Sequence, residues 1–144
     1  MIYLRYVYAK SSLPEPSTVA LFVEDNDWVK NEVTSEFAAV FPNSDVVLDL
    51  GEHTSQSSDL MVLVYRETTH ELKDLLEWGR YWLPEVRLAL GFYCVDRRRF
   101  DVVVPQEFGR WERRQQVLTR TARWLRQYPT LLNVCQIGLS RCAF

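Results

Sequence analysis

Two short apolar runs constrain the fold of this chain more than any other feature of its sequence. One covers residues 18–24 (TVALFVE) and the other covers residues 60–65 (LMVLVY). Each run is continuous rather than alternating, which is typical of a strand that is buried on both faces. Such strands occur in parallel sheets that carry helices on both sides. The two runs therefore predict an α/β protein with a parallel central sheet.

The remaining segments alternate between helix and strand patterns. Helices are predicted where apolar residues recur at spacings of three and four, and strands where short apolar runs lie between turn residues. The predicted helices cover residues 27–40, 68–83 and 105–127, and the further strands cover residues 45–50, 86–93 and 100–104. This order predicts a doubly wound, five-stranded parallel sheet. The connections after the second and fourth strands are too short for normal helices.

The chain divides into three parts by sequence pattern. Residues 1–17 are expected to be an N-terminal arm or an extra strand, followed by a linker that carries Pro14 and Pro16. Residues 18–127 are expected to form the α/β domain. Residues 128–144 form a tail that is too apolar to remain in water, so we expect it to pack on the domain or on a partner.

Composition narrows the class of protein. The formal net charge of -2 gives no general attraction to nucleic acid or to an acidic membrane. Cys94, Cys135 and Cys142 lack metal-ligand spacing, so we expect thiols in a reducing compartment. No apolar run reaches the length of a membrane span. We therefore expect a cytoplasmic protein without a metal or another cofactor.

Four blocks, in order and at suitable spacing, resemble the receiver domain of bacterial response regulators. The blocks are residues 23–26 (VEDN), 59–64 (DLMVLV), 83–90 (LPEVRLAL) and 101–105 (DVVVP). The resemblance covers roughly residues 18–127 and implies a flavodoxin-like, CheY-like fold. It also implies a crevice in which acids hold Mg²⁺ while a phosphoryl group moves to an Asp at the end of the third strand.

Compared position by position with that family, the chain keeps only part of the phosphotransfer site. Glu24 and Asp25 match the acidic pair, and they form either a vestigial acidic pocket or ordinary turn residues. Val64 occupies the position of the phosphoacceptor Asp, Gly91 or Phe92 that of the Thr or Ser, and Val104 that of the Lys. An apolar side chain at these positions neither accepts a phosphoryl group nor binds Mg²⁺. The resemblance therefore implies a pseudo-receiver.

Basic and aromatic residues on the last predicted helix form the main candidate for a partner-binding surface. They are Arg110, Arg113, Arg114, Arg120, Arg123 and Arg126, with Trp111 and Trp124. This pattern indicates either a surface that binds a partner or phosphate, or a solvated helix face whose arginines pair with acids elsewhere. On the preceding helix Trp78, Tyr81 and Trp82 cannot all face the core, so at least one ring is expected to lie exposed at an interface or to be covered by the N-terminal arm. Trp78 and Trp82 are therefore further candidates for partner binding.

Taken together, these patterns favour a non-enzymatic module that acts by protein–protein contact in bacterial signalling or transcriptional control. The resemblance implies a homodimer through the last helix, with nucleic acid reached only through another chain. One rival is a toprim-like nuclease that holds Mg²⁺ with Glu24 and either Asp96 or Asp101. Another rival is a sensor that binds a small phosphorylated ligand through Arg97, Arg98 and Arg99 at the carboxyl edge of the sheet. The alternative for these three arginines is an ordinary exposed turn.

Overall fold

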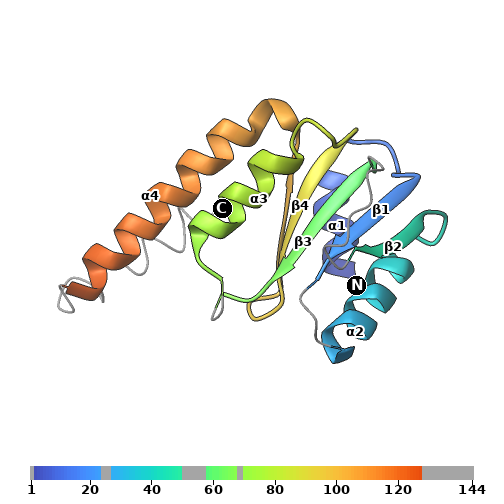
Figure 1. Cartoon of the computed structure of the whole chain (residues 1–144), viewed down its shortest axis with the longest axis horizontal. Helices are drawn as coiled ribbons and strands as arrows, with labels where there is room; N and C mark the ends of the chain where they lie inside the picture. The colour runs from blue at the N-terminus through green and yellow to red at the C-terminus, as the bar shows by residue number, and fades with distance from the viewer. Residues whose placement is uncertain (1, 24–26, 50–57, 68–69, 128–144) are drawn as a thin grey trace. The chain divides into compact units, whose positions relative to one another are not determined.

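The computed structural model describes residues 2–23, 27–49, 58–67 and 70–127 (Figure 1). The chain divides into two units, Met1–Phe108 and Gly109–Phe144. The first unit contains α1 (Ile2–Lys10), β1 (Thr18–Phe22), α2 (Asp27–Val40), β2 (Asp45–Asp49), β3 (Leu60–Tyr65), α3 (Leu72–Trp82), β4 (Ala89–Cys94), β5 (Arg99–Val103) and the 3-10 turn η1 (Pro105–Glu107). The long helix α4 (Phe108–Gln127) begins at the boundary of the two units.

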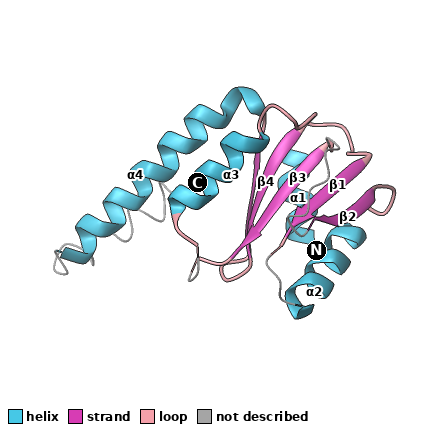
Figure 2. Cartoon of the chain, in the orientation of Figure 1, coloured by secondary structure: helices cyan, strands magenta, loops and turns pink. Residues whose placement is uncertain are grey.

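The five strands form one sheet in the order β2-β1-β3-β4-β5 (Figure 2). The first four strands are parallel to one another, as predicted, whereas β5 runs antiparallel to β4. The prediction of a fully parallel sheet is therefore wrong for β5. Only four residues, 95–98, join β4 to β5. A parallel return needs a crossover of a dozen or more residues, so this connection can only form a hairpin.

The N-terminal segment is the helix α1 and not the arm or extra strand that its β-prone residues suggested. Leu4 and Tyr8 lie four residues apart on one face of α1, and both are buried. The Tyr8 ring meets the Phe41 ring edge-on, with centroids 5.0 Å apart. Tyr8 also donates a hydrogen bond from its hydroxyl to the Pro14 carbonyl oxygen at 2.7 Å. Helices α1 and α2 together cover one face of the sheet, with Phe37 at the centre of that layer.

Helix α3 covers the opposite face of the sheet. Leu75, Leu76 and Gly79 are buried and form one stripe of the helix, as its apolar spacing predicts. Its first turn is closed by a capping box in which Glu71 and Asp74 each accept a hydrogen bond from the other's backbone. The helix therefore begins after Glu71, whereas the predicted start at residue 68 lies outside the described residues.

Asp59 fastens the amino ends of three strands to one another. Its carboxylate accepts a hydrogen bond from the Ser17 backbone N–H at 2.8 Å and lies 3.7 Å from the Arg87 guanidinium. Its own backbone N–H donates to the Thr18 hydroxyl at 2.9 Å. These contacts align the starts of β1, β3 and β4, and so they also fix where the carboxyl ends of β1 and β3 stand.

The apolar spacing along α4 predicts one inner stripe, and the structure confirms it only in part. Phe108, Trp111 and Leu125 are buried, Leu118 is half-buried and Ala122 is exposed. Among the described residues, no helix is both long enough and apolar enough to cross a membrane. The tail at residues 128–144 and its expected packing lie outside the described residues.

Candidate functional site

Val64 and Phe92, the two central positions in the receiver comparison, do not lie close together on one face of the sheet. Val64 is buried in the cluster that lies under α1 and α2. Phe92 points to the other face of the sheet, where its ring meets the Trp78 ring edge-on at 5.5 Å. Because the two side chains occupy opposite faces, they cannot line one crevice.

Val104 lies at the end of the sheet where the parallel strands begin, opposite their carboxyl ends. The antiparallel register pairs Val103 with Leu90, next to the first residue of β4. Val104 therefore follows β5 at the amino edge of the parallel strands. In a receiver the corresponding Lys must reach the carboxyl edge. The match of residues 101–105 to a parallel last strand is therefore wrong in direction, since a four-residue hairpin reverses β5.

The acids proposed as metal ligands are not brought together among the described residues. Glu24 and Asp25 lie outside those residues. Asp96 is exposed in the hairpin turn, and Asp101 lies within β5 opposite Phe92. In the part of the chain that the structure describes, no three His, Cys, Asp or Glu side chains are grouped so that they could hold a metal ion.

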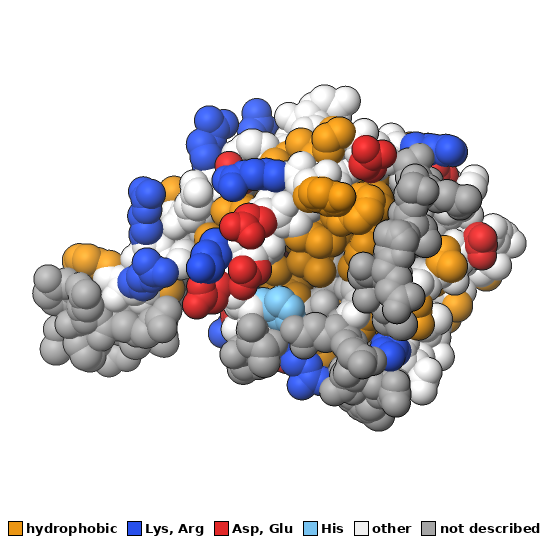
Figure 3. All heavy atoms as spheres, in the orientation of Figure 1, with side chains coloured by type: hydrophobic (Ala, Val, Ile, Leu, Met, Phe, Trp, Pro, Cys, Tyr) orange, Lys and Arg blue, Asp and Glu red, His pale blue; other side chains and the backbone are white. Residues whose placement is uncertain are grey.

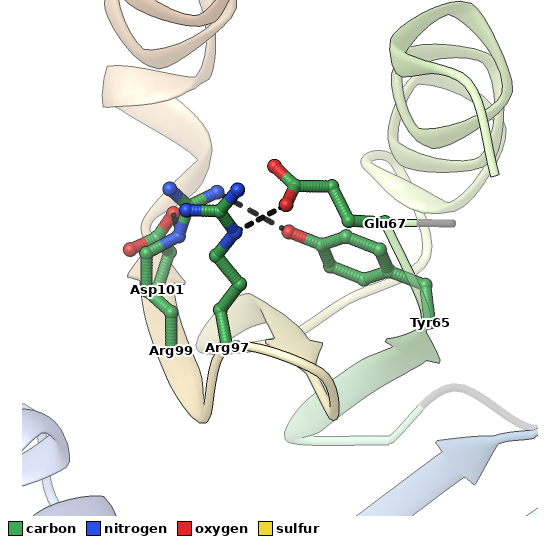
Figure 4. Close-up of polar contacts among 5 residues, drawn as sticks. All are labelled: Tyr65, Glu67, Arg97, Arg99 and Asp101. Carbon is green, nitrogen blue, oxygen red and sulfur yellow. Dashed lines mark hydrogen bonds and ion pairs between the residues drawn. The ribbon is translucent and has the colours of Figure 1, made fainter. Parts of the chain in front are cut away.

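A polar cluster does form at the carboxyl edge, on the α3 face (Figure 4). Tyr65, Cys94 and Arg99 stand side by side across β3, β4 and β5 because the register pairs them in a row. The Arg99 guanidinium donates to the Tyr65 hydroxyl at 3.4 Å, and its Nε lies 4.0 Å from an Asp101 carboxylate oxygen. Arg97 reaches from the hairpin and forms an ion pair with Glu67.

This cluster is electrically balanced. Two arginines face two carboxylates, so their charges are offset within the protein. Burial raises the pKa of Tyr65, and the hydrogen bond and charge of Arg99 oppose that rise. The Tyr65 hydroxyl is therefore a neutral hydrogen-bonding group at physiological pH, where it braces Arg99 against β3.

Of the three arginines expected to contact an anion, Arg98 differs from the others. It is exposed, and its backbone takes a left-handed conformation with φ of 50°. A residue other than glycine in that conformation is uncommon and is strained by its Cβ. Its place follows from the tight hairpin, which needs one left-handed residue to reverse the chain. Because Arg97 and Arg99 are paired within the protein, the three arginines form a turn that is held in place by its own contacts.

A second tyrosine, Tyr93 of β4, is hydrogen-bonded to α2 on the other face of the sheet. The Tyr93 hydroxyl donates to a Glu36 carboxylate oxygen at 3.1 Å. Burial raises the pKa of Tyr93 to about 12, and the negative charge of Glu36 contributes to the rise. The pair joins α2 to the sheet near its carboxyl edge.

An aromatic surface lies on α3. Tyr81 is 71% exposed, which confirms that one of the three rings on this helix faces solvent. Trp82 is half-buried, and its ring lies 4.9 Å from the Tyr81 ring and 5.1 Å from the Phe22 ring. Trp78 is half-buried between Phe22 and Phe92. Figure 3 shows hydrophobic side chains gathered on this face beside α3. Tyr81, which the candidate set of Trp78 and Trp82 omitted, is the most exposed of the three.

The outer face of α4 carries a mixed basic and apolar surface, which we call the arginine face. Its members recur at spacings of three and four and are all exposed: Arg110, Arg113, Arg114, Val117, Arg120 and Trp124. Figure 3 shows Lys and Arg side chains along this helix. Val117 is 56% exposed and Trp124 is 47% exposed. Arg123, also exposed, lies on its flank beside Arg120.

Two of the predicted residues of α4 do not contribute to this surface. Trp111 is buried and belongs to the opposite stripe of the helix, with Leu125. The side chain of Arg126 lies outside the described residues. The opposition of the two stripes follows from the 3.6-residue period, because positions three, four and seven apart share a face whereas positions two or five apart point to opposite sides.

No protein-family model, no curated protein and no solved structure matches the chain. The site is therefore interpreted from its own residues. Sequence reasoning found the arginines and tryptophans of α4, but it missed Tyr65 and Glu67, which position Arg99 and Arg97. The hydroxyl of Tyr65 at the end of the apolar 60–65 run could have indicated a hydrogen bond there, whereas the identity of its partner depends on the direction of β5.

Proposed function

We propose that this protein is a non-enzymatic regulatory module that binds an acidic surface of a partner protein through the arginine face of α4. The observation that carries the proposal is the exposure of four arginines around the two apolar side chains Val117 and Trp124. Arginine and tryptophan are among the residue types enriched where proteins bind proteins. A face that served solubility alone would not need the two apolar residues.

The receiver-like frame supports a regulatory role. The strand order β2-β1-β3-β4-β5 is the flavodoxin-like order of doubly wound sheets. The antiparallel β5 departs from that frame, and Val64 and Phe92, which the receiver resemblance aligns with phosphotransfer residues, are apolar and buried. A module of this kind would respond to a bound partner instead of an aspartyl phosphate, in bacterial signalling or transcriptional control.

The charge of the arginine face favours a different chain over a second copy. In a two-fold dimer the same patch meets itself, so arginines would oppose arginines across the interface. Like charges in such positions oppose association. An acidic partner surface would instead pair with the arginines and bury Val117, at the centre of the face, and Trp124, at its C-terminal end.

A comparison of charge-reversed variants tests the proposal. The chain is used as bait in extracts of its source cells, beside Arg113→Glu/Arg114→Glu/Arg120→Glu and a matched control, Arg5→Glu/Lys10→Glu/Lys73→Glu. Both triple variants change the net charge equally at exposed positions. We expect wild type and control to retain one acidic protein that the α4 variant loses. Retention by all three chains, or by none, would contradict the proposal.

Two further measurements separate the rival functions. Nuclease treatment distinguishes a protein partner from nucleic acid, because a partner that is lost on treatment would have been bound through a polynucleotide. Incubation with acetyl phosphate and Mg²⁺ is expected to leave the intact mass unchanged. A stoichiometric, acid-labile phosphate adduct would show that the chain retains a phosphoacceptor.

A further inference from the structure

Among the described residues, β2 forms a lateral edge of the sheet with β1 as its only neighbouring strand, whereas the other edge strand, β5, packs against α1. Strand β2 reads DVVLD, a short β-prone run between two acids. Natural edge strands are commonly protected by Lys, Pro or a bulge. Within β2, the run of three apolar residues between its terminal acids has none of these.

The hydrogen-bonding groups on the outer side of β2 can be assigned. The Asp45 backbone N–H donates inward to the Ser17 carbonyl oxygen at 2.8 Å. Because amide directions alternate along a strand, Val47 also faces β1, while Val46 and Leu48 direct their N–H and C=O groups outward. Within the part of the chain that the structure describes, an added strand therefore finds two residues whose N–H and C=O groups both point toward it.

The side chains of β2 supply apolar surface on both sides of that edge. Val47 is 49% exposed, on the face that α3 covers elsewhere, since it pairs with Ala20. Leu48 is 36% exposed, on the face of α2, since it pairs with Leu21. An added strand would cover part of both side chains.

The two acids at the ends of β2 determine the charge of a segment that can pair with this strand. If two copies paired antiparallel about Val47, Asp45 of each would stand opposite Asp49 of the other. Like charges placed directly opposite each other destabilise a strand pair. A second copy is therefore disfavoured, and an extended segment with basic residues at the two ends is favoured.

We infer that β2 is a strand-addition site for an extended segment of another protein that carries apolar or β-branched residues between two Lys or Arg residues. Backbone hydrogen bonds to Val46 and Leu48 would supply affinity, and Asp45 and Asp49 would supply selection. The site lies on a different unit from the arginine face, so it does not depend on the function proposed above.

Amide hydrogen exchange on the whole chain tests this inference. The probe is a nine-residue peptide of alternating valine and threonine with a lysine placed to oppose each acid, and the control peptide carries glutamate at those positions. We expect the lysine peptide to slow exchange at Val46 and Leu48, with little change at Val47, whose amide already faces β1. Protection elsewhere, or none at millimolar peptide, would overturn the inference.

Two variants distinguish strand addition from nonspecific attraction. We expect wild type to bind the lysine peptide about tenfold more tightly than the glutamate peptide. Asp45→Lys/Asp49→Lys is expected to reverse this preference. Leu48→Pro removes an outward N–H and no internal hydrogen bond, so we expect it to melt near the wild-type temperature and to lose binding. Equal binding of both peptides, or undiminished binding by a folded Leu48→Pro, would refute the site. Peptide-independent dimerisation in sedimentation would assign the edge to a second copy instead.

Discussion

Single side chains at the carboxyl edge explain why the receiver comparison does not carry its chemistry into this protein. The Val64 side chain is buried in the layer under α1 and α2, and the Phe92 ring contacts the Trp78 ring of α3. Arg97 and Arg99 are held by Glu67, Tyr65 and Asp101. These residues stabilise the edge of the sheet through packing and ion pairs.

Restoring the phosphoacceptor residue is expected to destabilise the protein without restoring the reaction. Val64→Asp would place a carboxyl group in an apolar layer with no partner, at a cost of about 3–5 kcal/mol in the free energy of unfolding. The control Val64→Ala loses only packing, about 2 kcal/mol. Urea denaturation measures both values. A Val64→Asp chain that is as stable as the control and gains acid-labile phosphate would contradict this placement.

The Tyr93–Glu36 pair predicts a loss of stability at alkaline pH. The folded chain holds the pKa of Tyr93 at about 12, above its ordinary value of 10.0, so the unfolded chain loses this proton first. Stability from this group is therefore complete below pH 10 and falls as pH rises from 10 to 12. We expect Tyr93→Phe to show a shallower fall than wild type over that window in denaturation at fixed pH. Identical slopes would show that Tyr93 titrates normally in the folded chain.

At the scale of elements, the sequence determined helices and strands more reliably than their directions. The continuous apolar runs placed β1 and β3, and the spacing of Val33, Phe37 and Val40 placed α2. Helix α1 was missed because its residues are β-prone, although Leu4 and Tyr8 already lie at a helical spacing. The reversal of β5 was missed because apolar pattern carries no direction. Connection length does, and four residues permit only a hairpin.

Two helical glycines provide a matched test of helix packing. A Cβ at Gly79 would lie 2.6 Å from Phe108 Cε1 and 3.3 Å from Phe92 Cζ, whereas a Cβ at Gly109 would meet nothing within 4 Å. Both substitutions gain helix propensity, worth about 1 kcal/mol. We expect Gly109→Ala to stabilise by about 0.5–1 kcal/mol and Gly79→Ala to destabilise by about 1–2 kcal/mol, because overpacking exceeds the gain. Thermal melts that shift in the same direction would contradict the packing of Phe108 on α3.

At the scale of the whole molecule, the two units offer surfaces of different chemistry. The first unit carries an aromatic surface on α3 and an acid-ended strand edge, and the second carries a basic helix face. The modest net charge of -2 conceals this separation, because the arginines gather on one helix. Sequence reasoning could locate those arginines on a helix. It could not separate buried Trp111 from exposed Trp124, because both are large aromatic residues and the sequence does not tell which stripe of the helix is buried.

The salt dependence of one dissociation constant tests the central claim most directly. The partner retained by wild type and lost by Arg113→Glu/Arg114→Glu/Arg120→Glu is titrated calorimetrically with both chains at several salt concentrations. We expect the wild-type Kd to weaken about tenfold or more between low and high salt, since screening removes the attraction between arginines and acids. The variant is expected to bind more weakly at every salt concentration and to show little weakening with salt. Equal affinities of the two chains, or a wild-type Kd that does not change with salt, would contradict binding through the arginine face.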